Sequence, residues 1–404
     1  MIMNEKTLIT GRIHYVGVND RRKHLFEGMW PLPQGVSYNS YLIDDDITCL
    51  VDTVDACYFE TYLRKIRRII GNKPIQYLII NHMEPDHSGS IRLIKQEYPD
   101  IVIVGNRQTF GMIEGYYGVT GERYEVKEGD FLDLGRHKLR FYLTPMVHWP
   151  ETMMTLDETD GVLFAGDAFG CFGTLDGGFL DTHIDTDRYW EEMIRYYANI
   201  VGKYGNPVQK ALAKLGGLPI RTICSTHGPV WTAQIPRVVG LYDRLSRYEA
   251  EEGVVIAYGS MYGHTEEMAE VIAAELSAQG IRNIILHDVS KSHPSYILKD
   301  IFKYRGLIVG SPTYCNHIYP EVESLLEKIL LREVRGRYLG LFGSFTWAGA
   351  AVKRMTELVE KGKFEPVGDP VEMKQALTLV VEERCEQLAR AMADRLKKDR
   401  KPNV

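Results

Sequence analysis

The sequence is poor in cysteine and contains no cysteine pair of the C-x-x-C type. This absence excludes zinc ribbons, rubredoxin-type iron sites and the disulfide frameworks of small secreted domains. The six cysteines are scattered over the whole chain, at Cys49, Cys57, Cys171, Cys224, Cys315 and Cys385. We therefore expect a protein of the reducing cytoplasm.

Long apolar runs and blocks of like charge are absent as well. The N-terminal residues MIMNEKTLITGRIHYVG have no apolar segment of a signal peptide, and no later window approaches the ~18 apolar residues of a membrane span. The 48 basic and 54 acidic residues are interspersed and leave a formal net charge of -6. Neither a membrane nor a nucleic acid is expected as a partner.

A chain of 404 residues with 45% hydrophobic content exceeds what one core usually organises, so two domains are expected. In the first part, short apolar runs end in turn signals and predict strands with helices between some of them. These runs lie at 40–53, 75–81, 101–105, 137–145, 161–167 and 220–228. A charged run stops near Glu252, and we place the boundary there, between domains 1–252 and 253–404.

The second domain alternates between buried-type strands and helices. The predicted strands lie at 253–259, 281–289, 304–312 and 337–345. Helices are expected to begin near Thr265, Ser295, Pro320 and Gly349, and a last helix is expected at 378–399. This order predicts a doubly wound parallel sheet.

Seven possible metal ligands are the most informative feature of the first domain. Four of them are packed into NHMEPDHSG, and three stand alone at or just beyond the ends of predicted strands: His82, Glu84, Asp86, His87, His148, Asp167 and His227. Loops at one edge of a sheet would bring these side chains together. Four imidazoles and three carboxylates suffice to hold two first-row metals with open positions for a substrate, and Asp167 could bridge both.

This motif resembles the metallo-β-lactamase superfamily, whose usual signature has a second histidine where Glu84 stands. A carboxylate hardens the site and favours iron over zinc, which directs the chemistry from hydrolysis to redox. All seven positions are similar to the signature of flavodiiron proteins. The resemblance implies a metallo-β-lactamase-like αββα sandwich followed by a flavodoxin-like sheet. It assigns His82, Glu84 and His148 to one iron, Asp86, His87 and His227 to the other, and Asp167 to the bridge.

The same resemblance implies two residues that line the metal pocket without binding metal. In flavodiiron relatives, a histidine of the N-terminal segment and a tyrosine lie there. In this chain they correspond to His24 and to Tyr196 or Tyr197, of which we assign Tyr197.

The second domain presents three loops at the carboxyl ends of its strands. The first, residues 259–265, resembles the phosphate loop of flavodoxins; it lacks G-x-G-x-x-G and a P-loop lysine, which favours FMN over a dinucleotide or ATP. Glu266 and Glu267 follow at once and oppose a phosphate charge. The expected flavin contacts are Ser260, Met261, Tyr262, Gly263, His264, Thr265, Pro312, Thr313, Tyr314, Cys315, Asn316, Ser344, Phe345, Thr346, Trp347, Ala348 and Gly349.

Within the family, overall similarity favours the branch in methanogens that oxidises reduced coenzyme F-420. Four electrons reduce dioxygen to two waters, whereas this donor delivers two at a time as hydride, so FMN is needed to relay them singly to the two irons. The resemblance also implies a head-to-tail homodimer, in which the FMN of one subunit faces the iron pair of the other. A dimer of dimers is a further assembly that the resemblance leaves open.

Four alternatives stay open. The same scaffold could reduce nitric oxide to N₂O, and a separate rubredoxin could be the electron donor. From other classes, the chain could be a dizinc hydrolase with a flavodoxin as scaffold, or a flavin electron carrier with a vestigial metal pocket. The acidic Glu84 argues against the hydrolase, and the complete ligand set argues against the carrier.

Overall fold

The computed structural model describes residues 6–400 and divides into two units. One unit comprises the chain up to Tyr197 together with Asn206–Asp243, and the other comprises Ala198–Gly205 together with the chain from Arg244 onward. The predicted boundary near Glu252 stays a prediction. Among the described residues, no helix has the length and apolar character that crossing a membrane requires.

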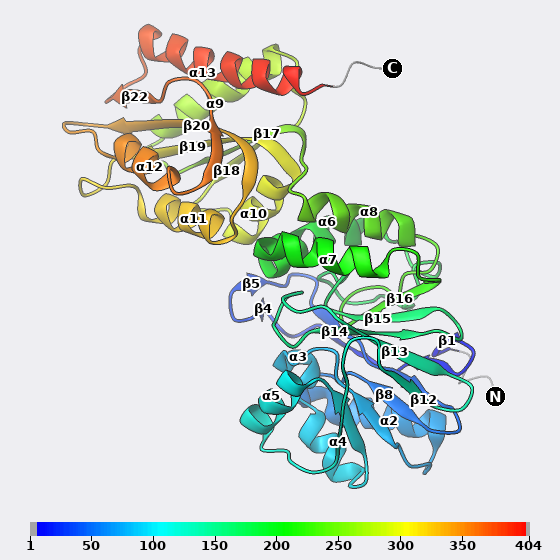
Figure 1. Cartoon of the computed structure of the whole chain (residues 1–404). Coiled ribbons are helices and arrows are strands. Elements are labelled where there is room, and N and C mark those ends of the chain that lie inside the picture. The colour runs from blue at the N-terminus through cyan, green and yellow to red at the C-terminus, as the bar shows by residue number, and fades with distance from the viewer. Residues whose placement is uncertain (1–5, 401–404) are drawn as a thin grey trace. The chain divides into compact units, whose positions relative to one another are not determined.

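The first unit contains two sheets with helices on their outer faces (Figure 1). The larger sheet has the order β1-β2-β7-β8-β9-β10-β11 and the smaller one the order β12-β13-β14-β15-β16. Helices α2, α4 and α5 lie beside the larger sheet, and α6, α7 and α8 lie beside the smaller one. Two two-stranded antiparallel sheets, β3-β6 and β4-β5, complete the unit. This arrangement confirms the predicted αββα sandwich.

The elements of the first unit have these bounds. The strands are β1 (Leu8–Thr10), β2 (Ile13–Tyr15), β3 (Val18–Asp20), β4 (Leu25–Phe26), β5 (Trp30–Pro31), β6 (Val36–Tyr38), β7 (Tyr41–Ile43), β8 (Cys49–Val51), β9 (Tyr77–Ile79), β10 (Val102–Gly105), β11 (Arg123–Glu125), β12 (Phe131–Asp133), β13 (Lys138–Leu143), β14 (Met153–Asp157), β15 (Val162–Gly166) and β16 (Thr222–Ser225). The helices are η1 (Ala56–Tyr58), α2 (Phe59–Ile70), α3 (Pro85–Ser88), α4 (Ile91–Glu97), α5 (Arg107–Tyr117), α6 (Asp187–Tyr196), η2 (Tyr197–Val201), η3 (Gly202–Tyr204), α7 (Gly205–Leu215) and α8 (Ile235–Ser246). Most of η2, all of η3, the first residue of α7 and the last three residues of α8 belong to the second unit.

Burial explains why the central strands of this unit read as continuous apolar runs. Every residue of β14 and β15 is buried, since these strands lie inside the smaller sheet and are covered on both faces. Strands β8, β9 and β10 run parallel, as do β15 and β16, so that the loops after them open at one edge of each sheet.

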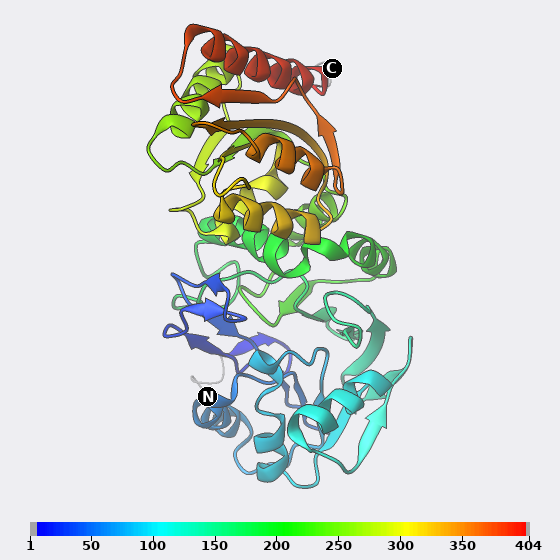
Figure 2. The ribbon, with the colours of Figure 1, turned by 90° about the vertical axis from the view of Figure 1, so that its left-hand side faces the viewer.

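The second unit is one sheet whose strand pairs are all parallel, as predicted. Its order is β18-β17-β19-β20-β21, with β22 also pairing with β20. Helices α9 and α13 cover one face, and α10, α11 and α12 cover the other (Figures 1 and 2). The bounds are β17 (Glu251–Tyr258), α9 (His264–Ala278), β18 (Ile284–Asp288), α10 (Pro294–Lys303), β19 (Tyr304–Pro312), α11 (Pro320–Leu331), β20 (Arg335–Phe345), α12 (Ala351–Val359), β21 (Lys363–Pro366), β22 (Val371–Lys374) and α13 (Leu379–Lys398).

The core of this unit lies between the sheet and the two helices α9 and α13. Ile256, Ile308 and Phe342 point from three neighbouring strands toward Ile272 and Leu388 of the two helices. All five are buried, so that the sheet is held rigid and the loops beyond its strand ends start from fixed points.

Candidate metal centre and cofactor loops

The segment after β9 makes a tight turn whose polar side chains point inward. Glu84 is the N-cap of α3, and Pro85 follows at the first helical position, where its fixed φ suits a helix start. His82 precedes this turn, and Asp86 and His87 lie within it. All four polar side chains are buried although they come from a loop and a single helical turn.

The other three predicted ligands come from separate loops of the smaller sheet. His148 lies between β13 and β14, Asp167 directly follows β15, and His227 lies just beyond β16. Gly166 has a φ of +56°, which lets the chain turn away from β15 immediately before Asp167. All three ligands are buried.

Three of the seven side chains, those of His82, Glu84 and His148, surround one oxygen of Asp167. The Nε2 of His148 lies 3.1 Å from Asp167 Oδ2, 3.1 Å from Glu84 Oε2 and 3.2 Å from His82 Nε2. The Nε2 of His82 is 3.7 Å from the same two carboxylate oxygens. One set of nitrogen and oxygen atoms therefore converges on a single position.

The remaining three side chains surround the other oxygen. Asp167 Oδ1 lies 3.0 Å from His87 Nε2 and 3.7 Å from His227 Nε2. Asp86 completes this set, with its two oxygens 3.6 Å from His87 Nε2 and 3.3 Å from His227 Nε2. Because its two oxygens face different sets, Asp167 is placed to bridge two ions.

The donor atoms are those of a metal site. Both carboxylate oxygens of Asp86, both ring nitrogens of His87 and the Nε2 of His227 are buried without a hydrogen-bond partner among residues 6–400. Buried polar atoms are costly when they are unsatisfied, and a cation bound between them removes that cost. The site therefore fits two metal ions.

The charges of the site compensate each other. Burial alone would raise the pKa of Asp167, but the imidazoles of His87 and His82 hold it well below its usual value. Burial opposes ionisation of Glu84 too, yet the hydrogen bond with His148 lowers its pKa to about 2. Burial raises the pKa of Asp86. The carboxylates thus depend on positive charge in the pocket, which metal ions would supply.

Two of the predicted ligand imidazoles make a hydrogen bond through Nδ1, the nitrogen that faces away from the metal position. The sequence did not indicate these contacts. His82 Nδ1 lies 2.7 Å from Glu151 Oε1, and the same oxygen accepts the backbone N–H of Met83 at 2.9 Å. His227 Nδ1 lies 2.7 Å from the carbonyl oxygen of Ser37. Both contacts place the ring proton on Nδ1 and leave Nε2 free for metal. The only signal for Glu151 in the sequence was an acidic residue three positions after a predicted ligand.

Of the two tyrosines considered, Tyr196 is the one in contact with the pocket. Its hydroxyl donates to Asp167 Oδ2 at 2.9 Å. Tyr197 is also buried, and its ring packs edge-on against Tyr242 at 5.2 Å. The assigned role of Tyr197 is therefore carried by its neighbour in this geometry.

The side chain of His24 is exposed. Phe26, two residues on, is buried and packs edge-on against His227 at 5.5 Å. The N-terminal segment thus reaches the metal centre through an apolar ring, and a role of His24 stays a prediction.

The three predicted cofactor loops meet at one edge of the second sheet. The register pairs Pro312 of β19 with Ser344 of β20, so these loops leave the sheet side by side. The hydroxyl of Ser344 lies 2.8 Å from that of Thr265 at the start of α9. Thr313 Oγ1 accepts the backbone N–H of Ala350 at 3.0 Å. Side-chain hydrogen bonds therefore join all three loops.

The first loop makes a tight turn at the start of α9. Gly263, the N-cap of α9, has a φ of +92°, a conformation that favours glycine. Its N–H donates to Ser260 Oγ at 3.1 Å. Glu266 follows this loop and would repel a phosphate. Its carboxylate accepts a hydrogen bond from the hydroxyl of Tyr258, the last residue of β17, at 3.0 Å.

Large side chains of these loops are exposed in a way that fits a flat aromatic ligand. Tyr262 is 87% exposed, Trp347 85% and Tyr314 45%. Exposed rings clustered around one sheet edge indicate a binding site rather than a core. The other predicted flavin contacts lie in the same three loops, with Thr265 and Pro312 buried and the rest at least partly accessible: Ser260, Met261, Gly263, His264, Thr313, Cys315, Asn316, Ser344, Phe345, Thr346, Ala348 and Gly349.

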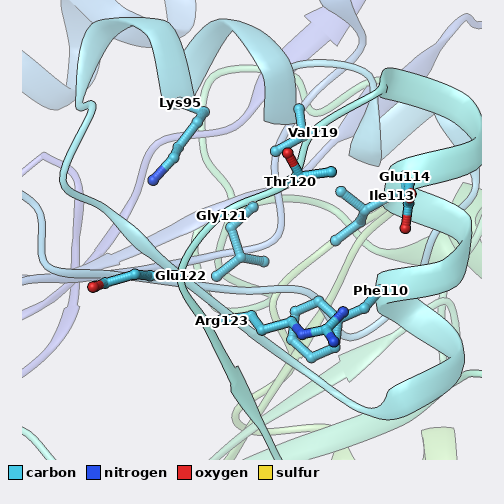
Figure 3. A pocket seen from close by; sticks show the side chains of 10 residues that line it. Lys95, Phe110, Ile113, Glu114, Val119, Thr120, Gly121, Glu122 and Arg123 are labelled. Carbon is cyan, nitrogen blue, oxygen red and sulfur yellow. The ribbon is translucent and has the colours of Figure 1, made fainter.

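A separate pocket of about 290 Å³ opens between α4, α5 and β11 (Figure 3). Arg123 lies over the ring of Phe110 at 5.2 Å, and Lys95 donates to the carbonyl of Ile101 at 2.8 Å. None of the seven predicted ligands lines it, so this pocket is distinct from the metal centre.

Comparisons with known proteins agree with both halves of this description. The model of the ODP family beta lactamase matches residues 36–228, and the flavodoxin model matches residues 256–393. A nitric oxide reductase of Moorella thermoacetica is 32% identical over 399 residues, which cover 98% of this chain and 100% of the relative. The anaerobic nitric oxide reductase flavorubredoxin of Escherichia coli O6:K15:H31 is 32% identical over 89% of this chain and 76% of its own length.

Solved structures are similar over nearly the whole chain. The rubredoxin oxygen:oxidoreductase of Desulfovibrio gigas has a TM-score of 0.93 at 31% identity, covering 97% of this chain and 98% of that one. A mutant flavo di-iron protein of Thermotoga maritima has a TM-score of 0.88 at 28% identity, covering 95% of this chain and 96% of that one.

The fold and the site define a β-lactamase-like metalloprotein joined to a flavodoxin. The chain belongs to the flavodiiron proteins, which confirms the family that the sequence resembles. Flavodiiron proteins carry a diiron centre and FMN, and the buried donor set and the exposed aromatic loops fit these two cofactors. Of the four relatives described above, two are named nitric oxide reductases, one is named a rubredoxin oxygen:oxidoreductase, and the name of the fourth gives no substrate.

Proposed function

We propose that this protein reduces dioxygen to water at a diiron centre, with FMN relaying electrons from reduced coenzyme F-420. The observation that carries the proposal is the pair of buried donor sets that share the carboxylate of Asp167. A hydrolytic site of this superfamily would have a second histidine in place of Glu84. The likeness to a rubredoxin oxygen:oxidoreductase supports oxygen as the substrate.

The iron ligands are proposed to divide as the two donor sets do. His82, Glu84 and His148 would hold the first iron, Asp86, His87 and His227 the second, and Asp167 would bridge them. Iron held in this way supplies electrons and Lewis-acid stabilisation to a bound substrate.

The chain itself orients the donors and excludes water. Glu151 and the carbonyl of Ser37 fix the rings of His82 and His227, and Tyr196 fixes one oxygen of Asp167. Because all ligands are buried, the reaction would proceed away from bulk solvent, which limits the escape of partly reduced oxygen.

The three loops of the second unit would hold FMN with their backbone amides, hydroxyl groups and aromatic rings. Ser260 and Gly263 would lie at the phosphate, and Tyr314 and Trp347 would lie against the ring system. FMN supplies the change from two-electron to one-electron transfer. These 404 residues contain no C-x-x-C pair, and as the electron donor we propose reduced coenzyme F-420.

Stopped-flow mixing tests the donor. Reduced coenzyme F-420, added anaerobically without any carrier protein, should bleach the absorbance of the bound flavin. If the flavin stays oxidised until a rubredoxin is supplied, the donor is a rubredoxin and this part of the proposal is wrong.

Nitric oxide reduction is the second candidate, because two curated relatives are named for it. Steady-state turnover of the fully reduced protein with O₂ and with NO compares the two substrates. We expect a higher kcat/KM for O₂ and two oxidised donors per O₂ consumed. A higher value for NO, with N₂O as product, would assign the chain to nitric oxide reduction.

Metal analysis separates both candidates from a dizinc hydrolase. Protein purified anaerobically should contain two irons per chain, whereas stoichiometric zinc with negligible iron would contradict the proposal. Oxygen consumption should be lost in Glu84→Ala and His148→Ala, and its survival would favour a flavin electron carrier.

We further propose that the active form is a head-to-tail homodimer, in which the flavin of one subunit serves the irons of the other. Mixing FMN-loaded His148→Ala, which lacks a metal ligand, with Trp347→Ala from which the FMN has been removed tests this arrangement. Heterodimers should recover part of the activity that neither homodimer has. A monomer by sedimentation, or mixtures without recovery, would contradict it. The cytoplasmic location stays a prediction.

A further inference from the structure

A second cluster of metal-ligating side chains lies at the opposite end of the smaller sheet. His148 precedes β14 and Asp167 follows β15, whereas Asp157 ends β14 and Asp160 lies in the turn before β15. His137 comes from the turn between β12 and β13, beside them. One donor atom of each of these last three residues lies within 4.8 Å of those of the other two.

His137 is the strongest sign that this cluster binds something. It is fully buried, and its Nδ1 lies 3.2 Å from Asp157 Oδ2. Yet neither ring nitrogen makes a hydrogen bond to any residue in the described range 6–400. The backbone N–H of His137 donates to Asp45 Oδ2 at 2.7 Å and fixes the position of the residue. A buried imidazole with two unsatisfied nitrogens is unfavourable unless a ligand occupies it.

The two carboxylates leave oxygens free for the same ligand. Asp157 is fully buried, and its Oδ1 and Oδ2 accept the backbone N–H groups of Thr159 at 3.2 Å and of Asp160 at 2.9 Å. An oxygen with two lone pairs can accept such a bond and still bind a cation. Asp160 Oδ1 faces Arg136 at 3.4 Å, but its Oδ2 is buried without a hydrogen-bond partner among the residues described.

The local charge favours a cation. Four carboxylates lie in or beside the cluster, those of Asp45, Asp46, Asp157 and Asp160. Two basic side chains, Arg12 and Arg136, form ion pairs with them. Two negative charges therefore remain, and two of the four carboxylates are fully buried or nearly so. A positive ion would offset them at low cost in hydration.

We propose that His137, Asp157 and Asp160 form a binding site for one divalent cation of the zinc class, separate from the diiron centre. One imidazole nitrogen and two carboxylate oxygens suit a borderline first-row ion, whereas Mg²⁺ and Ca²⁺ prefer oxygen alone. The bound ion ties the turn between β12 and β13 to the turn between β14 and β15. Its role is to stabilise the sheet end that lies away from the reaction.

Zinc chloride is the probe, added at micromolar concentration to the protein already loaded with iron and FMN. After equilibrium dialysis, elemental analysis should find one zinc per chain with the two irons retained. Asp160→Asn removes one ligand at a partly accessible turn and should weaken zinc binding at least about tenfold. Asp46→Asn is the matched control, because it removes an exposed carboxylate that is not a ligand and whose charge is screened by solvent, and its zinc affinity should stay within about twofold of the wild type.

Two results would overturn the site. The first is a dialysis in which the wild-type protein keeps its two irons and binds no zinc, or binds zinc only in exchange for iron. The other is wild-type zinc affinity in Asp160→Asn. An anomalous difference map at the zinc edge gives a test without any variant: the peak should lie between the three side chains, and a peak elsewhere or no peak would reject the proposal.

Discussion

Replacing Glu151 should weaken iron binding although Glu151 is not a predicted iron ligand. Glu151 is fully buried, and its Oε1 accepts from His82 Nδ1 at 2.7 Å and from the backbone N–H of Met83 at 2.9 Å. Burial would raise the pKa of Glu151, but the hydrogen bond from His82 holds it below its usual value. An anionic acceptor therefore orients the ring and makes its Nε2 a stronger donor to metal.

The size of the effect follows from the type of hydrogen bond that remains. Glu151→Gln keeps an oxygen of the same shape but removes the charge. Hydrogen bonds to charged groups contribute about 1.5–3 kcal/mol and neutral ones about 0.5–1.5 kcal/mol, so roughly 1 kcal/mol is lost. That corresponds to about fivefold weaker iron binding. Glu151→Ala also frees the ring to rotate, and a loss of about 10- to 100-fold is expected.

Anaerobic titration of the metal-free protein with Fe(II), in competition with a coloured chelator, measures these affinities. Glu122→Gln, which removes an exposed carboxylate in the same unit, is the matched control and should bind iron like the wild type. Circular dichroism confirms that each variant is folded. If folded Glu151→Ala binds two irons with wild-type affinity, the contact behind His82 contributes nothing and the reasoning fails.

Three further predictions concern other parts of the molecule. Arg337 is fully buried and donates to five backbone carbonyls, so Arg337→Met should destabilise the second unit by at least about 3 kcal/mol in urea unfolding; an unchanged midpoint would contradict this. Trp347→Ala should weaken FMN binding about tenfold by fluorescence titration and leave the FMN-free protein equally stable, because the ring is 85% exposed. Burial raises the pKa of the Cys57 thiol to about 11, and the Asp55 carboxylate is the next largest cause. The rate of Cys57 alkylation, measured by mass spectrometry, should therefore rise with pH up to about 11, and the midpoint pH of this rise should be lower in Asp55→Asn.

The sequence predicted the second unit more completely than the first. The strand expected at 304–312 has the same bounds in the structure, and helices expected near Thr265 and Pro320 begin at His264 and Pro320. Continuous apolar runs flanked by turns are strong signals because these strands are buried on both faces. The strands β21 and β22 were missed, since each has only four residues: β21 has no buried residue, and β22 alternates buried with exposed positions.

The structure brings the seven predicted ligands together because they lie in loops at strand ends, which the sequence pattern indicates; their binding of metal stays a prediction. The supporting contacts were not predictable. Glu151 reaches His82 only through the fold of the loop before β14, and a backbone carbonyl such as that of Ser37 has no signature in a sequence. Tyr196 and Tyr197 are neighbours where α6 ends and a π-helical turn begins. Side chains one position apart on a helix point about 100° apart, so only one of the two can face the pocket. The sequence does not define how the helix is rotated about its axis, and it therefore could not show which tyrosine faces the pocket.

These supporting contacts make the two metal positions unequal. The first position has Glu84 and one oxygen of Asp167, and behind His82 it has a third carboxylate, that of Glu151. The second has Asp86 and the other oxygen of Asp167, and behind His227 it has a neutral carbonyl, whereas the buried carboxylate of Asp52 interacts with its other histidine, His87. More negative charge around one ion stabilises its higher oxidation state. If the irons bind as proposed, the different groups behind their histidines would give the two irons different potentials even though each has two carboxylate donors.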